Sequence, residues 1–181
     1  MGQTDTCDTL DIAALTARDF ALGSLDDDLK VDRLCKALLM RFYEELLAGG
    51  TDPEAATALA GGADYFLRDF VIDRLQANPL GEEPGLVRRF AATWYIVSTM
   101  EPDAGELGRF LDGVAAFYRF LHRHGRVSAP YLAALEAECA DRAYYAGRIE
   151  AFWAISGDGY TAWERKCPLA ASVEKGGAAH G

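Results

Sequence analysis

Arginine and aromatic side chains occur together in two stretches of the chain, at residues 88–95 and 144–153. The candidates for binding a partner or a ligand are Arg88, Arg89, Trp94, Tyr95, Tyr144, Tyr145, Arg148 and Glu150. Tyrosine and arginine at the edge of an apolar surface suit a pocket or a protein interface. Ordinary core packing, with arginine stems lying along apolar surface, explains the same residues, so both interpretations stay open.

A second group of cations lies at the end of a predicted helix that Gly125 closes. Its members are Arg119, His122, Arg123 and Arg126, and the three arginines share one face if the helix persists that far. Such a cluster can hold a phosphate or a carboxylate, so it is the candidate anion site. The alternative is that cations at a helix C-terminus offset the negative end of the helix dipole.

Residues that commonly carry catalysis do not lie at the spacings that catalysis or metal binding needs. The histidines are His122, His124 and His180, and none follows a glutamate at the spacing of a di-iron bundle. The four cysteines lie far apart and form no short zinc-binding pair. No serine lies in a Gly-x-Ser-x-Gly turn, and no glycine-rich phosphate loop is present. We therefore expect no metal, no cofactor and no catalytic residue, and we favour a protein that is not an enzyme, although the sequence leaves that question open.

Acidic side chains outnumber basic ones by 28 to 18, which gives a formal net charge of −10. A protein that grips DNA over its whole surface needs surplus lysine and arginine to replace the counterions on phosphates. The charge is uneven, because residues 1–32 hold eight aspartates against Arg18 and Lys30, whereas residues 63–126 hold nine acidic side chains and eight arginines. The composition therefore opposes general nucleic-acid binding and leaves room for a local anion site.

No segment has the pattern of a targeting or membrane-spanning sequence. Residues 1–11 are polar and acidic, without the basic and apolar regions of a secretion signal. No stretch approaches the ~20 apolar residues that a spanning helix needs. Cys35 and Cys139 lie on apolar helical faces and are predicted to be small core residues. We therefore expect a cytoplasmic, reduced protein that contacts no membrane.

The elements that would position these residues are helices, because apolar side chains recur at three- and four-residue steps nearly throughout the chain. The clearest stripe runs through Leu107, Phe110, Leu111, Val114, Tyr118 and Leu121. No segment sustains the period of two that is typical of a strand. We therefore predict an all-α, single-domain bundle of six or seven helices with short loops.

Capping residues, prolines and glycines mark the predicted ends of these helices. Helices are expected to begin at Thr51–Glu54, at Asp103 and at Ser128. The helix that begins at Ser128 is expected to run to Trp153. The pair Gly61–Gly62 is expected to interrupt or break the helix in which it lies, because glycine is a poor helix former.

The predicted bundle occupies residues 25–171, between an acidic, partly helical segment at 1–24 and a disordered tail at 172–181. Gly108, Gly113 and Gly147 lie inside predicted helices, where each costs about 1 kcal/mol relative to alanine. Close approach of two helices would explain these glycines, and so would simple tolerance.

Residues 107–129 resemble a helix of the core-binding domain of tyrosine recombinases. The resemblance rests on a small residue, the aromatic pair Phe117–Tyr118, the basic Arg119, a leucine and the closing Gly125. It implies a small helical domain of the kind that packs against DNA. It implies no recombinase activity, because the residue three positions after His122 is Gly125 and the family's His-x-x-Arg pair is absent.

Three functional hypotheses remain. The leading one is a non-catalytic interaction or accessory protein that binds a protein partner, or a second copy of itself, through its helix faces. The second is an enzyme or binding protein for a small anionic ligand, with a pocket lined by aromatic and arginine side chains. The third is local contact with nucleic acid through Arg119, Arg123 and Arg126.

Overall fold

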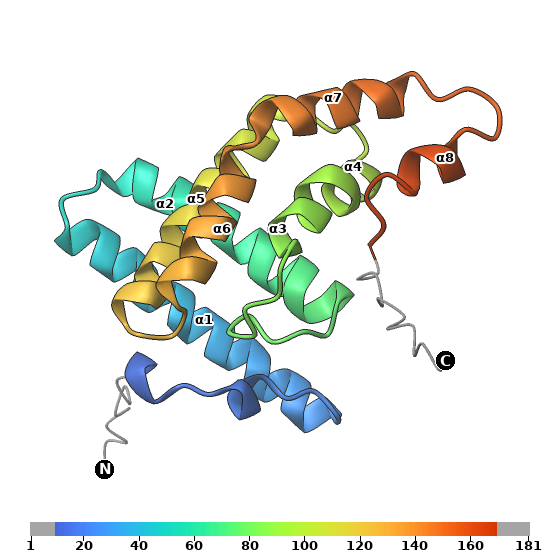
Figure 1. Ribbon diagram of the computed structural model, residues 1–181. Helices are drawn as coiled ribbons and strands as arrows, with labels where there is room; N and C mark the ends of the chain where they lie inside the picture. Colours follow the sequence, from blue (N-terminus) through green and yellow to red (C-terminus); the bar gives the residue numbers. More distant parts are fainter. Residues whose placement is uncertain (1–9, 170–181) are drawn as a thin grey trace, which may run out of the picture.

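The computed structural model describes residues 10–169, and helices are the only regular elements in that range (Figure 1). Short 3₁₀ turns come first, and two of the later elements are π-helical. In chain order the elements are η1 (Ile12–Ala14), η2 (Ala17–Phe20), α1 (Leu25–Ala48), α2 (Pro53–Asp64), η3 (Tyr65–Arg74), α3 (Leu86–Arg89), η4 (Phe90–Trp94), α4 (Tyr95–Ser98), α5 (Ala104–Arg123), α6 (Ala129–Ala140), α7 (Arg142–Trp153) and α8 (Tyr160–Glu164).

These elements join into fewer continuous helices. The π-helix η3 continues α2, and α3, η4 and α4 follow one another without a break, so residues 10–169 contain seven separate helices besides the 3₁₀ turns. The predicted all-α bundle is therefore confirmed. The predicted tail at 172–181 and the first nine residues of the chain lie outside the described range. Over the described range, no helix is both long and apolar enough to cross a membrane.

The predicted helix starts are confirmed by their capping contacts. The Asp52 carboxylate accepts hydrogen bonds from the backbone N–H groups of Glu54 and Ala55 at the start of α2. The Asp103 carboxylate caps α5 in the same way, at 2.7 Å from the backbone nitrogen of Glu106. Each cap satisfies N–H groups that have no partner inside the helix, which is why a short polar side chain marks the boundary.

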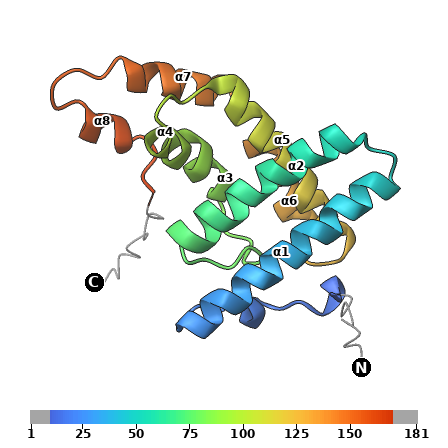
Figure 2. The same cartoon turned by 180° about the vertical axis from the view of Figure 1, so that it is seen from behind.

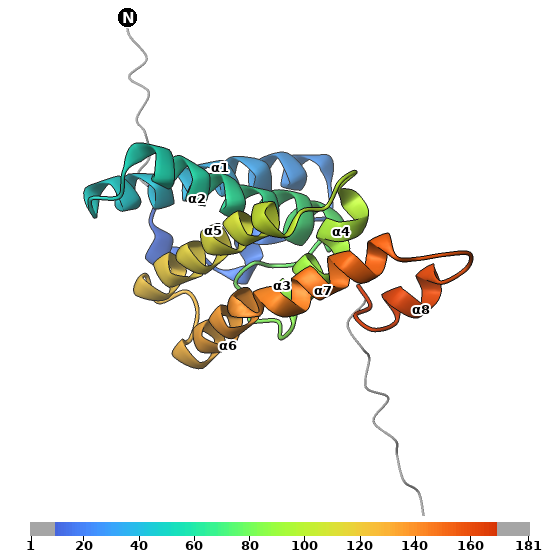
Figure 3. The same cartoon turned by 90° about the horizontal axis from the view of Figure 1, so that it is seen from above.

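Helix α5 crosses α2 at very close range, and α1 lies beside α2 on the same side of the molecule (Figures 2 and 3). A Cβ atom on Gly62 would lie 2.9 Å from Cα of Phe110, and one on Gly113 would lie 2.9 Å from the backbone nitrogen of Ala63. The prediction that Gly61–Gly62 breaks the helix is wrong, because α2 runs through both glycines. Gly62 and Gly113 instead permit two backbones to touch, whereas a Cβ on Gly147 would meet nothing within 4 Å.

The two π-helical segments pack against each other through aromatic rings. The ring centroids of Phe66 and Phe90 are 5.1 Å apart, and those of Phe70 and Trp94 are 5.3 Å apart. Phe66 and Phe70 are at most 1% exposed. Aromatic pairs at this spacing add stabilisation beyond their buried area, so this cluster forms the centre of the core.

The predicted single helix from Ser128 to Trp153 is divided in two. Asp141, with ψ at 48°, ends α6, and α7 continues in a different direction across the end of the bundle (Figure 1). The Asp141 carboxylate lies 3.0 Å from Nη2 of Arg88. After α7 the chain forms a loop and returns through α8 toward η4, which places residues 163–169 against the core.

Candidate functional site

Most of the predicted arginine and aromatic candidates lie inside the protein's own core. Five of the eight are at most 9% exposed: Arg89, Trp94, Tyr95, Tyr145 and Arg148. The Tyr95 hydroxyl donates to the Glu106 carboxylate at 2.7 Å, and the Tyr145 hydroxyl donates to the carbonyl of Glu138 at 2.7 Å. Burial raises the pKa of both phenols. Tyr95 and Tyr145 therefore join neighbouring helices through hydrogen bonds, and their buried rings cannot contact a partner.

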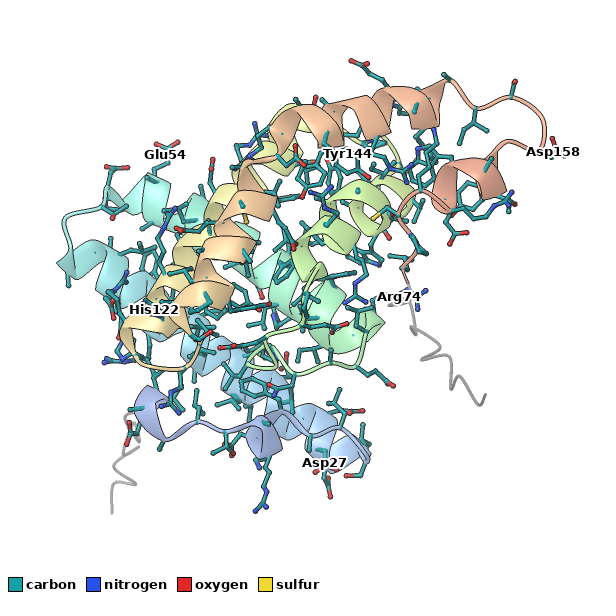
Figure 4. The ribbon with its side chains drawn as sticks, viewed as in Figure 1. Asp27, Glu54, Arg74, His122, Tyr144 and Asp158 are labelled. Carbon is teal, nitrogen blue, oxygen red and sulfur yellow. The ribbon has the colours of Figure 1, made fainter. Side chains whose placement is uncertain are left out.

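The remaining three candidates lie at the surface of α3 and α7. The Arg88 guanidinium lies 4.7 Å from the centroid of the Tyr144 ring and 3.0 Å from the Asp141 carboxylate. Figure 4 shows Tyr144 on the side of α7 that faces α4. Glu150 is exposed on the outer side of α7. The structure thus brings Arg88 and Tyr144 together, and Glu150 is not bonded to either.

Arg148 lies in what we call the C-terminal junction, formed by η4, α7 and residues 163–169. Its Nε donates to the carbonyl of Ala92 at 3.0 Å, and its Nη1 donates to the carbonyl of Trp163 at 2.7 Å. The guanidinium lies 3.8 Å from the Trp163 ring centroid. Its Nη2 is buried without a hydrogen-bond partner among residues 10–169. Burial lowers the pKa of this guanidinium.

Other contacts hold the same C-terminal segment in the junction. Nη1 of Arg89 donates to the carbonyl of Leu169 at 3.0 Å, and the hydroxyl of Thr93 donates to the carbonyl of Cys167 at 2.5 Å. Nε1 of Trp163 donates to the carbonyl of Arg148 at 3.0 Å. The space beside the predicted arginines is therefore filled by the chain itself.

The second predicted cluster, at the end of α5, is engaged in holding neighbouring elements. Arg119 pairs with Glu136 of α6, and Arg123 pairs with Glu45 of α1. Nη1 of Arg126 donates to the carbonyl of Leu15 at 2.8 Å. A ring nitrogen of His122 lies 2.9 Å from the carbonyl oxygen of Val127, within its own turn. Each side chain thus has a partner, and the four do not converge on an open anion site.

Glu45 is the acidic centre of that cluster. Its carboxylate also lies 2.8 Å from Nε2 of His124. Burial raises the pKa of Glu45, but the hydrogen bonds from His124 and Arg123 outweigh this effect and lower the pKa overall. The side chains at the end of α5 and just after it therefore bond to α1, to α6 and to Leu15 in the N-terminal segment.

An open apolar groove lies between α1 and α2, where the sequence analysis identified no candidate. The groove has a volume of about 510 Å³ and is lined by Lys36, Leu39, Met40, Tyr43, Thr57, Ala60, Gly61, Asp64 and Arg68. Met40 is 57% exposed, although it is apolar and unbranched. The α2 wall is low at Gly61, because glycine has no side chain, and the space there is open, since a Cβ on Gly61 would meet nothing within 4 Å. We call this feature the α1–α2 groove.

A second hollow, of about 390 Å³, adjoins the groove between α1 and η3. Its lining is Leu22, Asp28, Asp32, Cys35, Arg68, Asp69, Ile72, Asp73 and Gln76, and we call it the acidic hollow. Arg68 lines both features and pairs with Asp64 and Asp32. Burial raises the pKa of Asp69, and the nearby carboxylates of Asp64 and Asp73 raise it further.

Within the part of the chain that the structure describes, no group of three or more His, Cys, Asp or Glu side chains is arranged to hold a metal ion. Cys35 and Cys139 are buried, as predicted, and burial raises the pKa of each thiol to about 12. A thiol with so high a pKa is a poor nucleophile at neutral pH.

One signal in the sequence marks the groove. Lys36, Met40, Tyr43 and Leu47 follow four- and three-residue steps on α1, beside the core stripe through Cys35, Leu38 and Phe42. A helix with two adjacent apolar stripes has more apolar surface than one core can cover. The small residues of α2 carry no such signal.

No protein-family model, no curated protein and no solved structure matches the chain, so its function has to be argued from the groove and the junction themselves.

Proposed function

We propose that this protein is a non-catalytic interaction protein that binds a helical segment of a partner protein in the α1–α2 groove. The observation that carries the proposal is an apolar groove of about 510 Å³ between α1 and α2, which no other element within residues 10–169 covers. An amphipathic helix that lays its apolar face into such a groove is a common mode of peptide recognition.

The lining of the groove suits a helical occupant. Leu39, Met40 and Tyr43 form an apolar wall on α1, and the flexible thioether of Met40 can adapt to different side chains. On α2, Ala60 and Gly61 form a low wall that lets another backbone come close. Burial of this surface by a partner would supply the hydrophobic driving force for binding.

The experiment compares Gly61→Glu with Gly147→Glu as bait. Both glycines lie inside helices at positions where a Cβ meets nothing within 4 Å, so both variants are expected to fold. Gly61→Glu places a charged side chain in the groove, and Gly147→Glu places the same side chain on α7. Proteins captured from a lysate of the source cells are compared by mass spectrometry for the wild type and both variants.

A protein captured by the wild type and by Gly147→Glu, and lost with Gly61→Glu, is the expected result. Cross-linking from a photoreactive residue at Thr57, which is exposed beside the groove, then identifies the bound segment. If every captured protein is retained by Gly61→Glu, the groove is not the binding site and the proposal fails.

We do not propose a pocket for a small anionic ligand at the C-terminal junction, because residues 163–169 fill the space beside Arg148 and bond to its guanidinium.

A further inference from the structure

The α1–α2 groove and the acidic hollow follow one another along α1, with the Arg68–Asp32 ion pair where they meet, and we call the two together the track. Arg68 contributes to the lining of both, and the α1 residues that line them follow one another from Tyr43 and Met40 through Lys36 and Asp32 to Asp28. Helix α1 rises about 1.5 Å per residue, so the track is about 22 Å long. That length matches a helical segment of about 15 residues. Figure 2 shows α1 and α2 side by side.

The two ends of the track differ in chemistry. The groove end is lined by apolar side chains, including Leu39, Met40 and Tyr43. The hollow end holds the carboxylates of Asp28, Asp32, Asp69 and Asp73. A segment that fills the whole track therefore meets apolar surface at one end and negative charge at the other.

The cations along the track do not neutralise its acidic end. Lys36 lies 2.7 Å from the Asp32 carboxylate, and Arg68 is shared between Asp32 and Asp64. Among residues 10–169, Asp28, Asp69 and Asp73 take part in no ion pair. Burial and then the neighbouring carboxylates of Asp64 and Asp73 raise the pKa of Asp69, and the opposing effect of Arg68 does not outweigh them.

We propose that the occupant of this track is an amphipathic partner segment with an apolar stretch over Met40 and Tyr43 and a cluster of lysine or arginine over Asp69 and Asp73. The inference rests on the proposed function and adds the charge and the polarity of the partner. A basic cluster at one end fixes the direction in which the segment lies, because the reversed segment would place its cations on apolar surface. Complementary charge also speeds association and discriminates against acidic competitors.

The experiment uses synthetic probes, since it needs no knowledge of the natural partner. The first is a fluorescein-labelled 18-residue helical peptide with a leucine–alanine face and four lysines at one end. The second carries four glutamates in place of the lysines, and the third is a scramble of the first. Dissociation constants are measured by fluorescence anisotropy with the full-length protein at two salt concentrations.

Matched protein variants separate local recognition from the general negative charge of the chain. Asp69→Asn/Asp73→Asn removes two charges in the hollow. Glu101→Gln/Asp158→Asn removes the same number of charges at exposed loop positions, and Asp158 lies on the loop between α7 and α8, far from α1 (Figure 4). We expect the hollow variant to bind the lysine peptide about tenfold more weakly and the loop variant to bind it within about twofold of the wild type.

The outcomes distinguish this inference from the proposed function. If Gly61→Glu weakens binding of the lysine peptide but both charge variants bind alike, the groove is a binding site and the basic partner is ruled out. If the lysine peptide binds no better than its scramble, the inferred chemistry fails, and lysate capture still decides the proposed function. If the wild type dimerises in sedimentation and Gly61→Glu does not, the occupant is a second copy of this chain and the inference is overturned.

Discussion

Arg68, at the open groove, and Arg148, at the closed C-terminal junction, are held in opposite ways. Arg68 is one-third exposed at its side chain and pairs with the carboxylates of Asp64 and Asp32. Arg148 is 4% exposed, and its partners among residues 10–169 are two backbone carbonyls and the face of Trp163. At the groove, the Arg68 guanidinium is paired with carboxylates, and the side chain of Met40 is exposed. At the junction, the Trp163 side chain is buried, and the Arg148 guanidinium has no carboxylate partner among residues 10–169.

Exposed apolar surface, rather than the arginine and aromatic residue types, marks the candidate binding site in this protein. Arginine next to aromatic residues is typical of an interface, and that pattern drew the sequence analysis to Arg148 and Tyr145. Arg148 is covered by η4 and α8, and Tyr145 is buried beside Glu138 of α6. The exposed surface of the groove includes Met40 and Gly61, and neither residue type by itself indicates a binding site.

Trp163→Ala tests the junction and should have the largest effect. Truncation of a buried tryptophan costs about 3–5 kcal/mol, and here it also uncovers the Arg148 guanidinium. We expect faster amide exchange throughout α8 and a lower melting temperature. Tyr160→Ala, at a side chain that is 42% exposed on the same helix, is the control and should change little. Unchanged exchange in α8 would show that the junction does not hold the segment.

Gly113→Ala tests the closed contact between α5 and α2. The added methyl group would overlap backbone atoms of Leu59 and Ala63, which cannot rotate away as a side chain can. Overpacking of this kind costs about 1–3 kcal/mol, which outweighs the helix propensity gained from alanine. Urea unfolding gives the change in the free energy of unfolding, and an increase in stability would contradict the close approach of the two helices.

Gly61→Ala tests the open side of α2. It should change the free energy of unfolding in the opposite direction, toward greater stability. Its methyl group meets no atom, so the substitution should stabilise the protein by about 1 kcal/mol through helix propensity alone. The measurement is again urea unfolding, with Gly147→Ala as a second open helical position. A loss of stability in Gly61→Ala would mean that the groove is already filled.

Asp69→Asn should have the smallest effect on stability, and the size of that effect depends on pH. The pKa of Asp69 is raised in the folded state by burial and by Asp64 and Asp73, so folding favours the protonated form. The free energy of unfolding therefore falls as the pH rises above the ordinary aspartate pKa of 3.8. Once the pH exceeds the pKa of the folded state, the carboxyl is charged in both states and stability falls no further. Asp69→Asn should be slightly more stable than the wild type at pH 7, with the difference closing below about pH 4. A variant that is less stable than the wild type at pH 7 would show that the carboxylate is favourably placed.

Local patterns accounted for much of the fold. The caps Asp52, Asp103 and Ser128 began helices where predicted, because a short polar side chain bonds N–H groups within its own turn. The stripe through Leu107, Leu111 and Tyr118 is buried, as its spacing indicates. The break at Asp141 was missed because the apolar steps continue from Cys139 to Ala146 and Ile149, and no glycine or proline marks the end of α6.

The candidate site was not predictable in the same way. Arg148 has the residue type of an interface, but α8 packs over it, and the sequence around Arg148 does not record that contact. The α1–α2 groove depends on the angle and spacing of two helices, and its low wall at Gly61 depends on which glycine of the pair α5 contacts.

The sequence by itself determined that this protein is a bundle of capped, amphipathic helices, because the period of apolar residues and the capping contacts act over one or two turns of the chain. Only the tertiary structure decided which apolar faces are covered and which are left open. That choice is made by contacts between residues far apart in the sequence, such as Gly113 with Ala63 and Trp163 with Arg148, and no local spacing records them.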